Sequence, residues 1–165
     1  MIKKIAIFIH LLLVGLQAGL HVGSVLYYNP GIDALSSQVL QIQVQKSINF
    51  AFAPTIAFFF TITTLSSLPV LYIVRKQKKV FRLFLIACLC LIVATISTIV
   101  VNVPINNFIM HSSVEAILPL WAIMRNRWNL FNILRTILLV TALCIELGTL
   151  MFGIRLEEME KRLKV

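Results

Sequence analysis

Two histidines, an arginine and a glutamate lie inside stretches of sequence that are otherwise hydrocarbon. His10 and His21 fall in the first apolar run of the chain, and Arg135 and Glu146 fall in the last. A histidine is a general base near neutral pH, and an arginine guanidinium holds an oxyanion in a planar fork. The two histidines are about three helical turns apart, and so are the arginine and the glutamate. Each pair therefore lies on one face of its helix.

The depths of these side chains match if the first and last apolar helices are antiparallel neighbours. In such a pair, residues at equal depth have a constant sum of residue numbers. His10 with Glu146 and His21 with Arg135 have the same sum. Two further pairs share it: Ser24 with Asn132, and Tyr28 with Trp128. We expect His10 and Glu146 to form a structural pair, because an unpaired charge inside a bilayer is expensive.

Asparagines gather where the third apolar run ends and the fourth begins. An amide is costly in a bilayer because lipid offers it no hydrogen-bond partner, so this cluster calls for an explanation. Amides and a guanidinium together are suited to hold a developing oxyanion. We predict a catalytic site with His21 as the base and Arg135 as its electrostatic partner. The groups expected to bind the substrate around them are Asn102, Asn106, Asn129, Asn132, Ser24, Tyr28 and Trp128.

The composition indicates that a membrane protein carries these groups. Of 165 residues, 59% are hydrophobic and 13% are charged, and the mean hydropathy is +0.95. Soluble domains carry about 25% charged residues. The net charge of +9 would also suit nucleic acid. The basic residues, however, form short clusters beside apolar runs, which is typical of topology signals and of contacts with anionic lipid. We therefore expect no nucleic-acid partner.

Four apolar runs are long enough to cross a bilayer, which takes about 20 helical residues. They cover about residues 5–28, 48–74, 83–103 and 130–153. We predict an all-α integral membrane protein with a single domain, residues 1–165. Its architecture is expected to be a four-transmembrane-helix up-down bundle, with short interfacial helices on the extracytoplasmic side.

The distribution of basic residues predicts the orientation. They are concentrated at the N-terminus, in the loop 75–82 and in the tail 154–165. The positive-inside bias places these three regions in the cytoplasm, and the segments 29–47 and 104–129 outside it. The expected location is the bacterial inner membrane, crossed several times, with both termini cytoplasmic.

Metal and haem sites are alternatives for the histidines. His10 and His21 lie about 16 Å apart along one helix and cannot share an ion. His21 and His111 would hold a single metal ion if the loop folds back. A haem needs one axial histidine and an apolar slot, which His10 or His21 would supply. The three cysteines match no zinc or redox spacing. We predict no cofactor and no metal ligand, with haem or one ion at His21 and His111 as alternatives.

The order of short motifs along nearly the whole chain supports a family resemblance. A glycine-bearing first helix ends in Asn29-Pro30, and Gln45-Lys46-Ser47-Ile48-Asn49 precedes Pro54. Then follow Asn102-Val103-Pro104-Ile105-Asn106-Asn107 and Arg127-Trp128-Asn129, which lead to Arg135-Thr136. This order resembles the anthrone oxygenase-like family of small four-span membrane proteins. Most bacterial members are catalogued only as a domain of unknown function.

The resemblance implies an activity as well as a fold. Fungal members of the family are associated with oxidising polycyclic anthrones to anthraquinones, using molecular oxygen and no recognised cofactor. The resemblance thus implies an oxidoreductase or oxygenase that acts on a hydrophobic aromatic or quinol-like molecule in the outer half of the bundle.

A second functional class fits the same residues. The chain would then be a non-enzymatic lipid-binding or small-molecule-binding membrane protein, or a subunit of a larger membrane assembly, and its polar cluster would be structural. Membrane lipids and a hydrophobic small molecule are the expected partners, and a homo-oligomer is compatible with the sequence. The enzyme predicts a cavity of ~300 Å³ or more that opens beside Pro104 and is lined by the site residues. The alternative predicts a packed interior.

Overall fold

The computed structural model describes residues 1–153, and all regular structure in that part of the chain is helical. The elements in chain order are α1 (Ile2–Gly23), η1 (Ser24–Tyr28), α2 (Asn29–Asp33), α3 (Gln38–Val74), α4 (Lys78–Ser97), η2 (Thr98–Asn102), α5 (Val103–His111), α6 (Val114–Ile117), η3 (Leu118–Leu120), α7 (Trp121–Gly148) and η4 (Thr149–Gly153). Of the irregular elements, η1, η2 and η4 are π-helical turns and η3 is a 3₁₀ turn.

These elements join into four long apolar rods. The rods cover Ile2–Asp33, Gln38–Val74, Lys78–His111 and Val114–Phe152, and each is long and apolar enough to cross a membrane. The chain is therefore an all-α, multi-pass integral membrane protein with four helices, as the sequence predicted. The predicted tail, 154–165, lies outside the described residues.

Two rods continue past prolines that we expected to end them. The first helix runs through Pro30 to Asp33, and the third runs through Pro104 to His111. A proline removes an N–H and crowds the carbonyl four residues earlier. In both rods a π-helical turn, η1 or η2, lies directly before the proline-bearing segment. The wider turn makes room for the ring, so the helix continues instead of ending.

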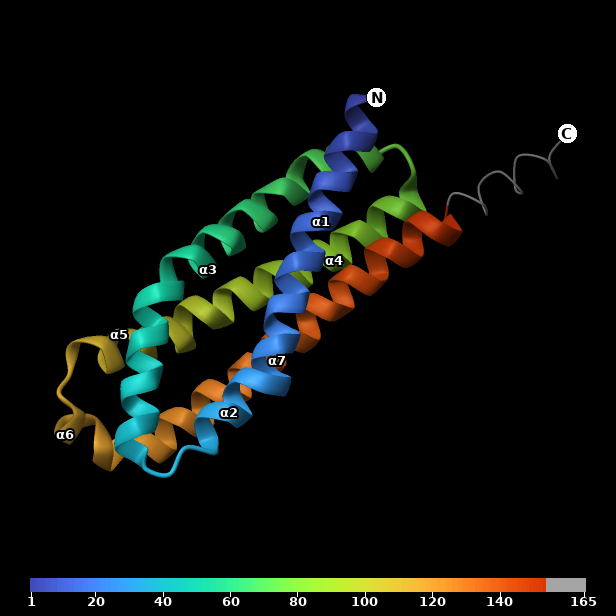
Figure 1. The fold of residues 1–165 in the computed structure, drawn as a ribbon. Helices are drawn as coiled ribbons and strands as arrows, with labels where there is room; N and C mark the ends of the chain where they lie inside the picture. The colour runs from blue at the N-terminus through green and yellow to red at the C-terminus, as the bar shows by residue number, and fades with distance from the viewer. Residues whose placement is uncertain (154–165) are drawn as a thin grey trace, which may run out of the picture.

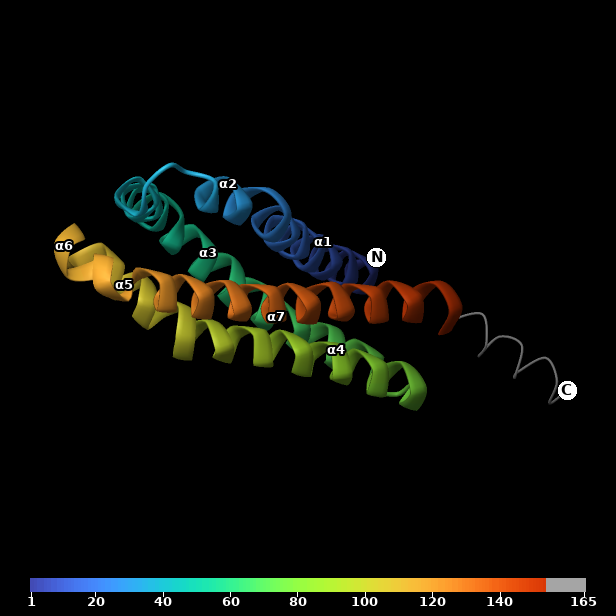
Figure 2. The ribbon, with the colours of Figure 1, turned by 90° about the horizontal axis from the view of Figure 1, so that it is seen from below.

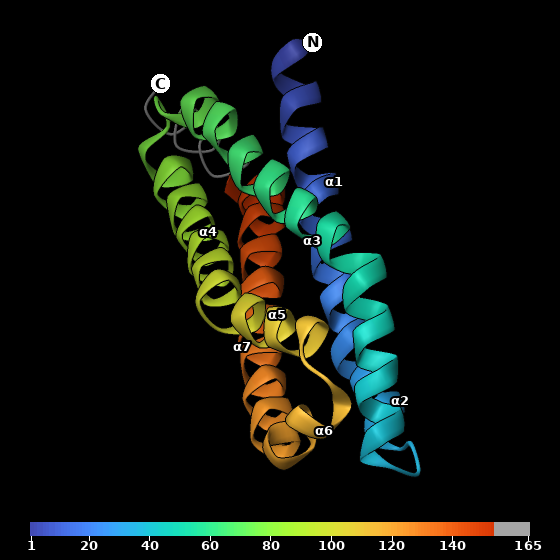
Figure 3. The same ribbon diagram turned by 90° about the vertical axis from the view of Figure 1, so that its left-hand side faces the viewer.

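The rods pack as an antiparallel bundle. Helix α7 contacts both α1 and α4, and α3 contacts α1 and α4 on the other side. Figure 1 and Figure 3 show the N-terminus and the turn between α3 and α4 at one end, here called the terminal end. The opposite end carries α2, α5 and α6 and is called the α6 end. Figure 2 shows α4 and α7 running alongside each other for most of their length.

Three apolar clusters hold the rods together. The central one is rich in alanine, which lets helix backbones approach closely in lipid. Its buried members are Val14, Ala18, Phe60, Ala87, Leu91, Ala94, Leu139 and Ala142. A second cluster, around Ile42 and Trp121, closes the α6 end, and a third, around Val70 and Phe84, closes the terminal end. Between these clusters lie the buried polar side chains.

Candidate functional site

The pair His10–Glu146 lies in the half of the bundle nearer the terminal end. His10 Nε2 is 3.0 Å from Glu146 Oε1, and both side chains are fully buried. On the other edge of the ring, His10 Nδ1 is 2.7 Å from Ser66 Oγ. The Ser66 hydroxyl donates its proton to the Thr63 carbonyl, so Oγ accepts from the Nδ1–H of His10.

With this arrangement the pair has two possible protonation states, and both have the same net charge. Either an imidazolium donates to the Glu146 carboxylate, or a protonated Glu146 donates to a neutral imidazole. In both forms each group stabilises the other, which is what an ionisable pair in a bilayer interior requires. Glu146 lies level with His10 because α1 and α7 are antiparallel neighbours.

His21 lies further along the same face of α1, and its orientation is fixed by its own helix. The side chain is buried, and its Nδ1–H donates to the Gln17 carbonyl at 2.8 Å. In the neutral ring the lone pair is therefore on Nε2, for which no partner is found within residues 1–153. A neutral imidazole held in one tautomer with a free Nε2 is the form a general base requires.

Phe60 from α3 contacts both His21 and Arg135. The rings of His21 and Phe60 meet edge to face, with centroids 5.3 Å apart. The guanidinium carbon of Arg135 lies 5.7 Å from the Phe60 centroid. The base and the cation thus contact the same aromatic ring. Sequence reasoning missed Phe60, because one phenylalanine in an apolar run carries no signal of its own.

Arg135 is held by its own side of the bundle. Its Nη1 donates to Thr98 Oγ1 at 3.0 Å and its Nη2 to Asn132 Oδ1 at 2.5 Å. The Asn132 amide in turn donates to Ser24 Oγ at 3.1 Å, which ties α7 to the end of the first rod. Three predicted site residues, Arg135, Asn132 and Ser24, therefore form one hydrogen-bonded chain. The Nε of Arg135 is buried and has no partner among the described residues.

Asn102, Asn106 and Trp128 join η2 and α5 to the start of α7. Asn102 Nδ2 donates to the Trp128 carbonyl at 3.3 Å, and Trp128 Nε1 donates to Asn106 Oδ1 at 2.9 Å. Two of the predicted substrate-binding amides are thus engaged in holding the backbone and the indole of α7. Asn102 keeps one buried, unpaired oxygen, Oδ1.

Arg125 organises the α6 end, although it is not among the site residues predicted from the sequence. Its Nε donates to Asp33 Oδ1 at 2.9 Å, its Nη1 to Gln45 Oε1 at 2.7 Å and its Nη2 to the Asn29 carbonyl at 3.1 Å. The rings of Trp121 and Trp128 lie 6.0 and 5.6 Å from its guanidinium carbon. Trp121 is four residues before Arg125 and Trp128 is three after it. Residues at these spacings are neighbours on a helix, so the sequence could have indicated that Arg125 contacts both rings.

The last two predicted residues border this region. Asn129 Nδ2 reaches Asp33 Oδ2 at 3.5 Å. Tyr28 is level with Trp128 by number, but no hydrogen bond or ring contact joins the two among the described residues. The Tyr28 hydroxyl is buried without a partner. Both residues therefore belong to the surroundings of Arg125, nearer the α6 end than Arg135.

Buried polar atoms without a hydrogen-bond partner are concentrated in the half of the bundle nearer α6. Within residues 1–153 they are Gln17 Oε1 and Nε2, Tyr28 Oη, Asn29 Oδ1, Asn49 Nδ2, Thr63 Oγ1, Asn102 Oδ1, Asn129 Oδ1, Arg135 Nε and Glu146 Oε2. Buried polar atoms nearly always have partners, and each exception calls for an explanation. The set holds both donors and acceptors, which suits a ligand that carries both hydroxyl and carbonyl groups.

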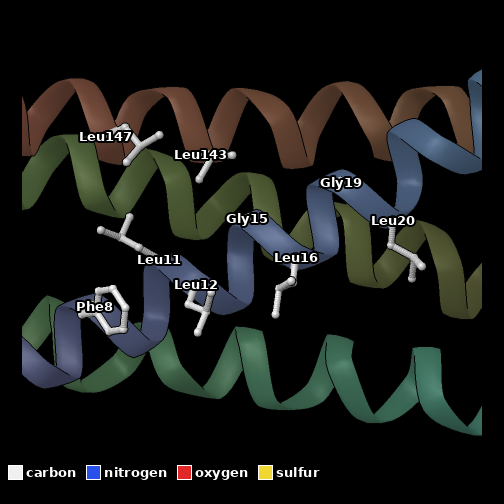
Figure 4. Close-up of a pocket in the computed structure, with 9 residues that line it drawn as sticks. All are labelled: Phe8, Leu11, Leu12, Gly15, Leu16, Gly19, Leu20, Leu143 and Leu147. Atoms are coloured by element: carbon white, nitrogen blue, oxygen red, sulfur yellow. The ribbon is translucent and has the colours of Figure 1, made fainter.

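Two pockets on the structure lie away from this cluster. One, of about 730 Å³, is a groove on the outer side of α1 beside Leu143 and Leu147 of α7. Figure 4 shows that leucines and Phe8 project around Gly15 and Gly19, so the groove offers no polar group. The other, of about 530 Å³, lies between α3 and α5. Neither is lined by His21, Arg135 or Pro104, so neither is the cavity expected beside Pro104.

The histidines proposed for a metal ion are on separate elements. His21 is buried in α1, whereas His111 is exposed at the end of α5, where its Nδ1–H donates to the Asn107 carbonyl at 2.8 Å. In the part of the chain that the structure describes, no three histidine, cysteine or carboxylate side chains are grouped closely enough to hold an ion. Haem or a single ion at His21 and His111 stays a prediction.

The comparisons with known proteins agree with this membrane architecture. A family model described as anthrone oxygenase matches residues 47–145, which is more than half of the chain. The chain belongs to the anthrone oxygenase family. No curated protein and no solved structure matches it.

The part that matches the anthrone oxygenase family contains most of the polar cluster but not all of it. It runs from Ser47 in α3 to Ile145 in α7 and so includes Phe60, Asn102 and Arg135. Helix α1, with His10 and His21, lies outside it. The family match therefore covers the cation and the amides of the candidate site, whereas the candidate base is positioned by packing α1 against the matched helices.

Proposed function

We propose that this chain is a membrane-embedded oxidoreductase that uses molecular oxygen to oxidise a hydrophobic, flat aromatic or quinol-like molecule. The reaction would take place in the half of the bundle nearer α6. Membership of the anthrone oxygenase family supports the reaction class. The observation that carries the proposal is that His21 and Arg135 contact the same buried aromatic ring, Phe60.

The surroundings of Phe60 suit a flat, partly polar ligand. The ring belongs to the central apolar cluster, so hydrocarbon lies on the side toward the terminal end. Toward the α6 end are the unpaired atoms of Asn102, Arg135 and Tyr28. In this proposal the Phe60 side chain leaves its place against His21 and Arg135 when the substrate binds. The substrate ring would then occupy that place.

The chemistry that we propose begins with removal of a proton from carbon. His21 Nε2 takes one proton from a methylene group that lies between two aromatic rings and opposite a carbonyl. The remaining electron pair is delocalised onto the carbonyl oxygen. The guanidinium of Arg135 and the Asn132 amide are suited to hold this oxyanion, as donors that are already oriented before the reaction.

The anion then reduces molecular oxygen directly. One oxygen atom becomes the new carbonyl of the substrate, and the other leaves as water with the two hydrogens of the methylene group. The carbon loses four electrons and the oxygen molecule gains four, so CH₂ + O₂ gives C=O + H₂O. No further reductant is required, which agrees with the expectation of no cofactor.

The test uses the purified full chain and a hydroxylated anthrone, with oxygen uptake and quinone absorbance followed together. Loss of a general base lowers a rate by about 10²–10⁴-fold, and we expect a fall of that order for His21→Ala. His111→Ala is the matched control, because it removes an exposed histidine outside the cluster. If the wild-type chain does not exceed the spontaneous oxidation rate, or if both variants behave alike, this proposal is wrong.

A non-enzymatic role is the second candidate, and one observation favours it. Much of the predicted substrate-binding set is already engaged inside the protein, and the two pockets lie outside the cluster. In that case His21→Ala and Arg135→Lys would change the stability of the protein without affecting binding of any aromatic ligand. Equilibrium binding of the anthrone to the variants, measured without oxygen, separates the two candidates.

We also propose the location and orientation. The bacterial inner membrane with both termini in the cytoplasm follows from the clusters of basic residues at the N-terminus, in the loop 75–82 and in the tail. Membrane lipids are the expected surroundings, and self-association is compatible with the lipid-facing groove on α1.

A further inference from the structure

The pocket between α3 and α5 has a chemistry of its own. It measures about 530 Å³ and is lined by Lys46, Ser47 and Phe50 from α3 and by Met110 and His111 from α5. This volume falls within the range of about 300–1,000 Å³ for small-molecule sites. None of the five residues belongs to the cluster around His21, so the pocket needs a separate explanation.

The pocket crosses the boundary between polar and apolar sequence. Lys46 and Ser47 directly precede the uncharged run 48–74, and Phe50 lies in the first turn of that run with 80% of its surface exposed. On the facing helix, His111 is the last residue of α5 and Met110 precedes it. In a membrane the polar members would lie at head-group depth and the apolar members at the edge of the hydrocarbon.

The rim of the pocket carries a cation with an anion nearby. The Lys46 ammonium donates one of its three N–H groups to the Ser112 carbonyl. Ser112 lies just before α6, and Glu115 is in the first turn of that helix. The Glu115 side chain is exposed and lies three residues after Ser112, whose carbonyl Lys46 contacts. A ligand at this rim therefore meets one positive and one negative side chain.

We infer that this pocket binds the head group of a membrane phospholipid that carries a phosphate and a primary amine, of the phosphatidylethanolamine type. The phosphate pairs with the Lys46 ammonium and the head-group amine with Glu115, while an acyl chain leaves along Phe50. A head group with only negative charge would be repelled by Glu115. A quaternary amine has no N–H to donate to the carboxylate, so it would bind less well.

The groove on α1 provides a comparison within the same molecule. It is lined by apolar residues alone, so an acyl chain lying there meets no group that distinguishes one head group from another (Figure 4). Selectivity between lipids that share their acyl chains should therefore arise at the pocket beside Lys46.

The experiment titrates the purified full chain with three phospholipids that have the same acyl chains, and native mass spectrometry counts the bound lipids. The head groups are ethanolamine, glycerol and choline. One charged contact near the membrane surface is worth about fivefold in affinity, so we expect one ethanolamine lipid to bind about fivefold more tightly than the others. Lys46→Gln should weaken the binding of all three lipids at this site, because all three carry the phosphate. Glu115→Gln should make the glycerol lipid bind at least as well.

Two further variants protect the test against a folding defect. Met110→Trp fills the pocket without changing any charge, and it should abolish both the binding and the preference for ethanolamine. Arg127→Gln removes one exposed positive charge from the same end of the bundle and should leave the preference unchanged. Lys46→Gln also removes the contact with Ser112 and so can prevent folding. In that case Met110→Trp is the variant that tests whether the lipid binds in this pocket.

Four results would overturn the inference. The first is equal binding of the three lipids by the wild-type chain, and the second is an ethanolamine preference that persists in Met110→Trp. The third is an effect of Arg127→Gln on lipid binding that is as large as that of Lys46→Gln. The fourth is competition by free phosphoethanolamine at the same concentration as the lipid. The last result would indicate a site for a soluble phosphate ester. None of these measurements depends on the oxidation of an anthrone, so this inference and the proposed function fail separately.

Discussion

The pair His10–Glu146 allows a quantitative test of how α1 is fixed to α7. The perturbations are His10→Ala, Glu146→Ala and the double change. His10 Nε2 and Glu146 Oε1 are 3.0 Å apart, and neither side chain is exposed. In soluble proteins, removing one partner of a buried ion pair costs about 3–5 kcal/mol, because it leaves the other charge uncompensated.

Here the remaining partner can lose its charge, which lowers that cost. After Glu146→Ala the imidazole becomes neutral and keeps its Nδ1–H bond to Ser66, so the loss is one buried hydrogen bond and an unsatisfied Nε2, about 1–3 kcal/mol. After His10→Ala the carboxyl is protonated and likewise lacks a partner. We therefore expect each single variant to lower the free energy of unfolding by about 2 kcal/mol.

The double variant distinguishes contact from coincidence. Once one partner is gone, removing the other no longer breaks the bond, so the two losses should overlap by about 0.5–3 kcal/mol. The assay is reversible unfolding in mixed detergent micelles, followed by circular dichroism. His10→Ala combined with Glu115→Ala, an exposed carboxylate on α6, is the matched control and should be additive. Strict additivity for His10 with Glu146 would refute the register of α1 against α7.

Three further predictions concern the remaining polar residues. Arg125→Ala removes three hydrogen bonds from a buried guanidinium and should cost about 3 kcal/mol of stability, measured in the same unfolding assay, with a red shift of tryptophan emission. Arg135→Lys keeps the charge but loses the fork that joins Thr98 and Asn132, so anthrone oxidation should fall by about 10²–10³-fold while the helical circular dichroism is retained. With Ser113→Cys, a membrane-impermeant thiol reagent added to intact cells should label the chain, whereas a C-terminal tag should stay protected from external protease. If external protease removes the tag and the thiol reagent does not label Ser113→Cys, the proposed orientation is wrong.

The equal-depth argument shows how far the sequence alone reached. Two antiparallel helices with the same rise keep a constant sum of residue numbers, and no knowledge of side-chain packing is needed. In the structure His10 contacts Glu146 and Ser24 contacts Asn132, both at the shared sum. The four-helix membrane fold followed from composition and run length, which depend on the chain as a whole and so tolerate local exceptions.

The same argument predicts depth but not the hydrogen-bond partner of a side chain. Tyr28 and Trp128 share the sum, yet the Trp128 indole donates to Asn106. Between Ser24 and Tyr28 the first rod widens into the π-helical turn η1 ahead of Pro30. A wide turn shifts every later residue in rotation and in height relative to α7. The sequence marked the proline, but it did not show whether the helix would end there or widen.

The positions of Phe60 and Arg125 depend on tertiary packing that no local pattern encodes. Phe60 comes from α3 and lies between side chains of α1 and α7, and Arg125 joins α7 to Asp33, Gln45 and the backbone of Asn29. Each position is set by three rods at once. Sequence reasoning therefore identified which kinds of groups are buried near the α6 end, but not which side chains they contact.

His21 and Arg135 differ in their hydrogen-bond partners. This difference decides which of the two substitutions can distinguish a catalytic role from a structural one. Arg135 joins η2 to α7 through Thr98 and Asn132, so its loss weakens the bundle as well as any site. His21 makes its only side-chain hydrogen bond among the described residues to its own helix, at the Gln17 carbonyl, and its ring contacts Phe60 of α3. Removing the imidazole therefore breaks no side-chain hydrogen bond between rods among the described residues. If His21→Ala abolishes activity but leaves the stability unchanged, His21 acts as a base and does not have a mainly structural role.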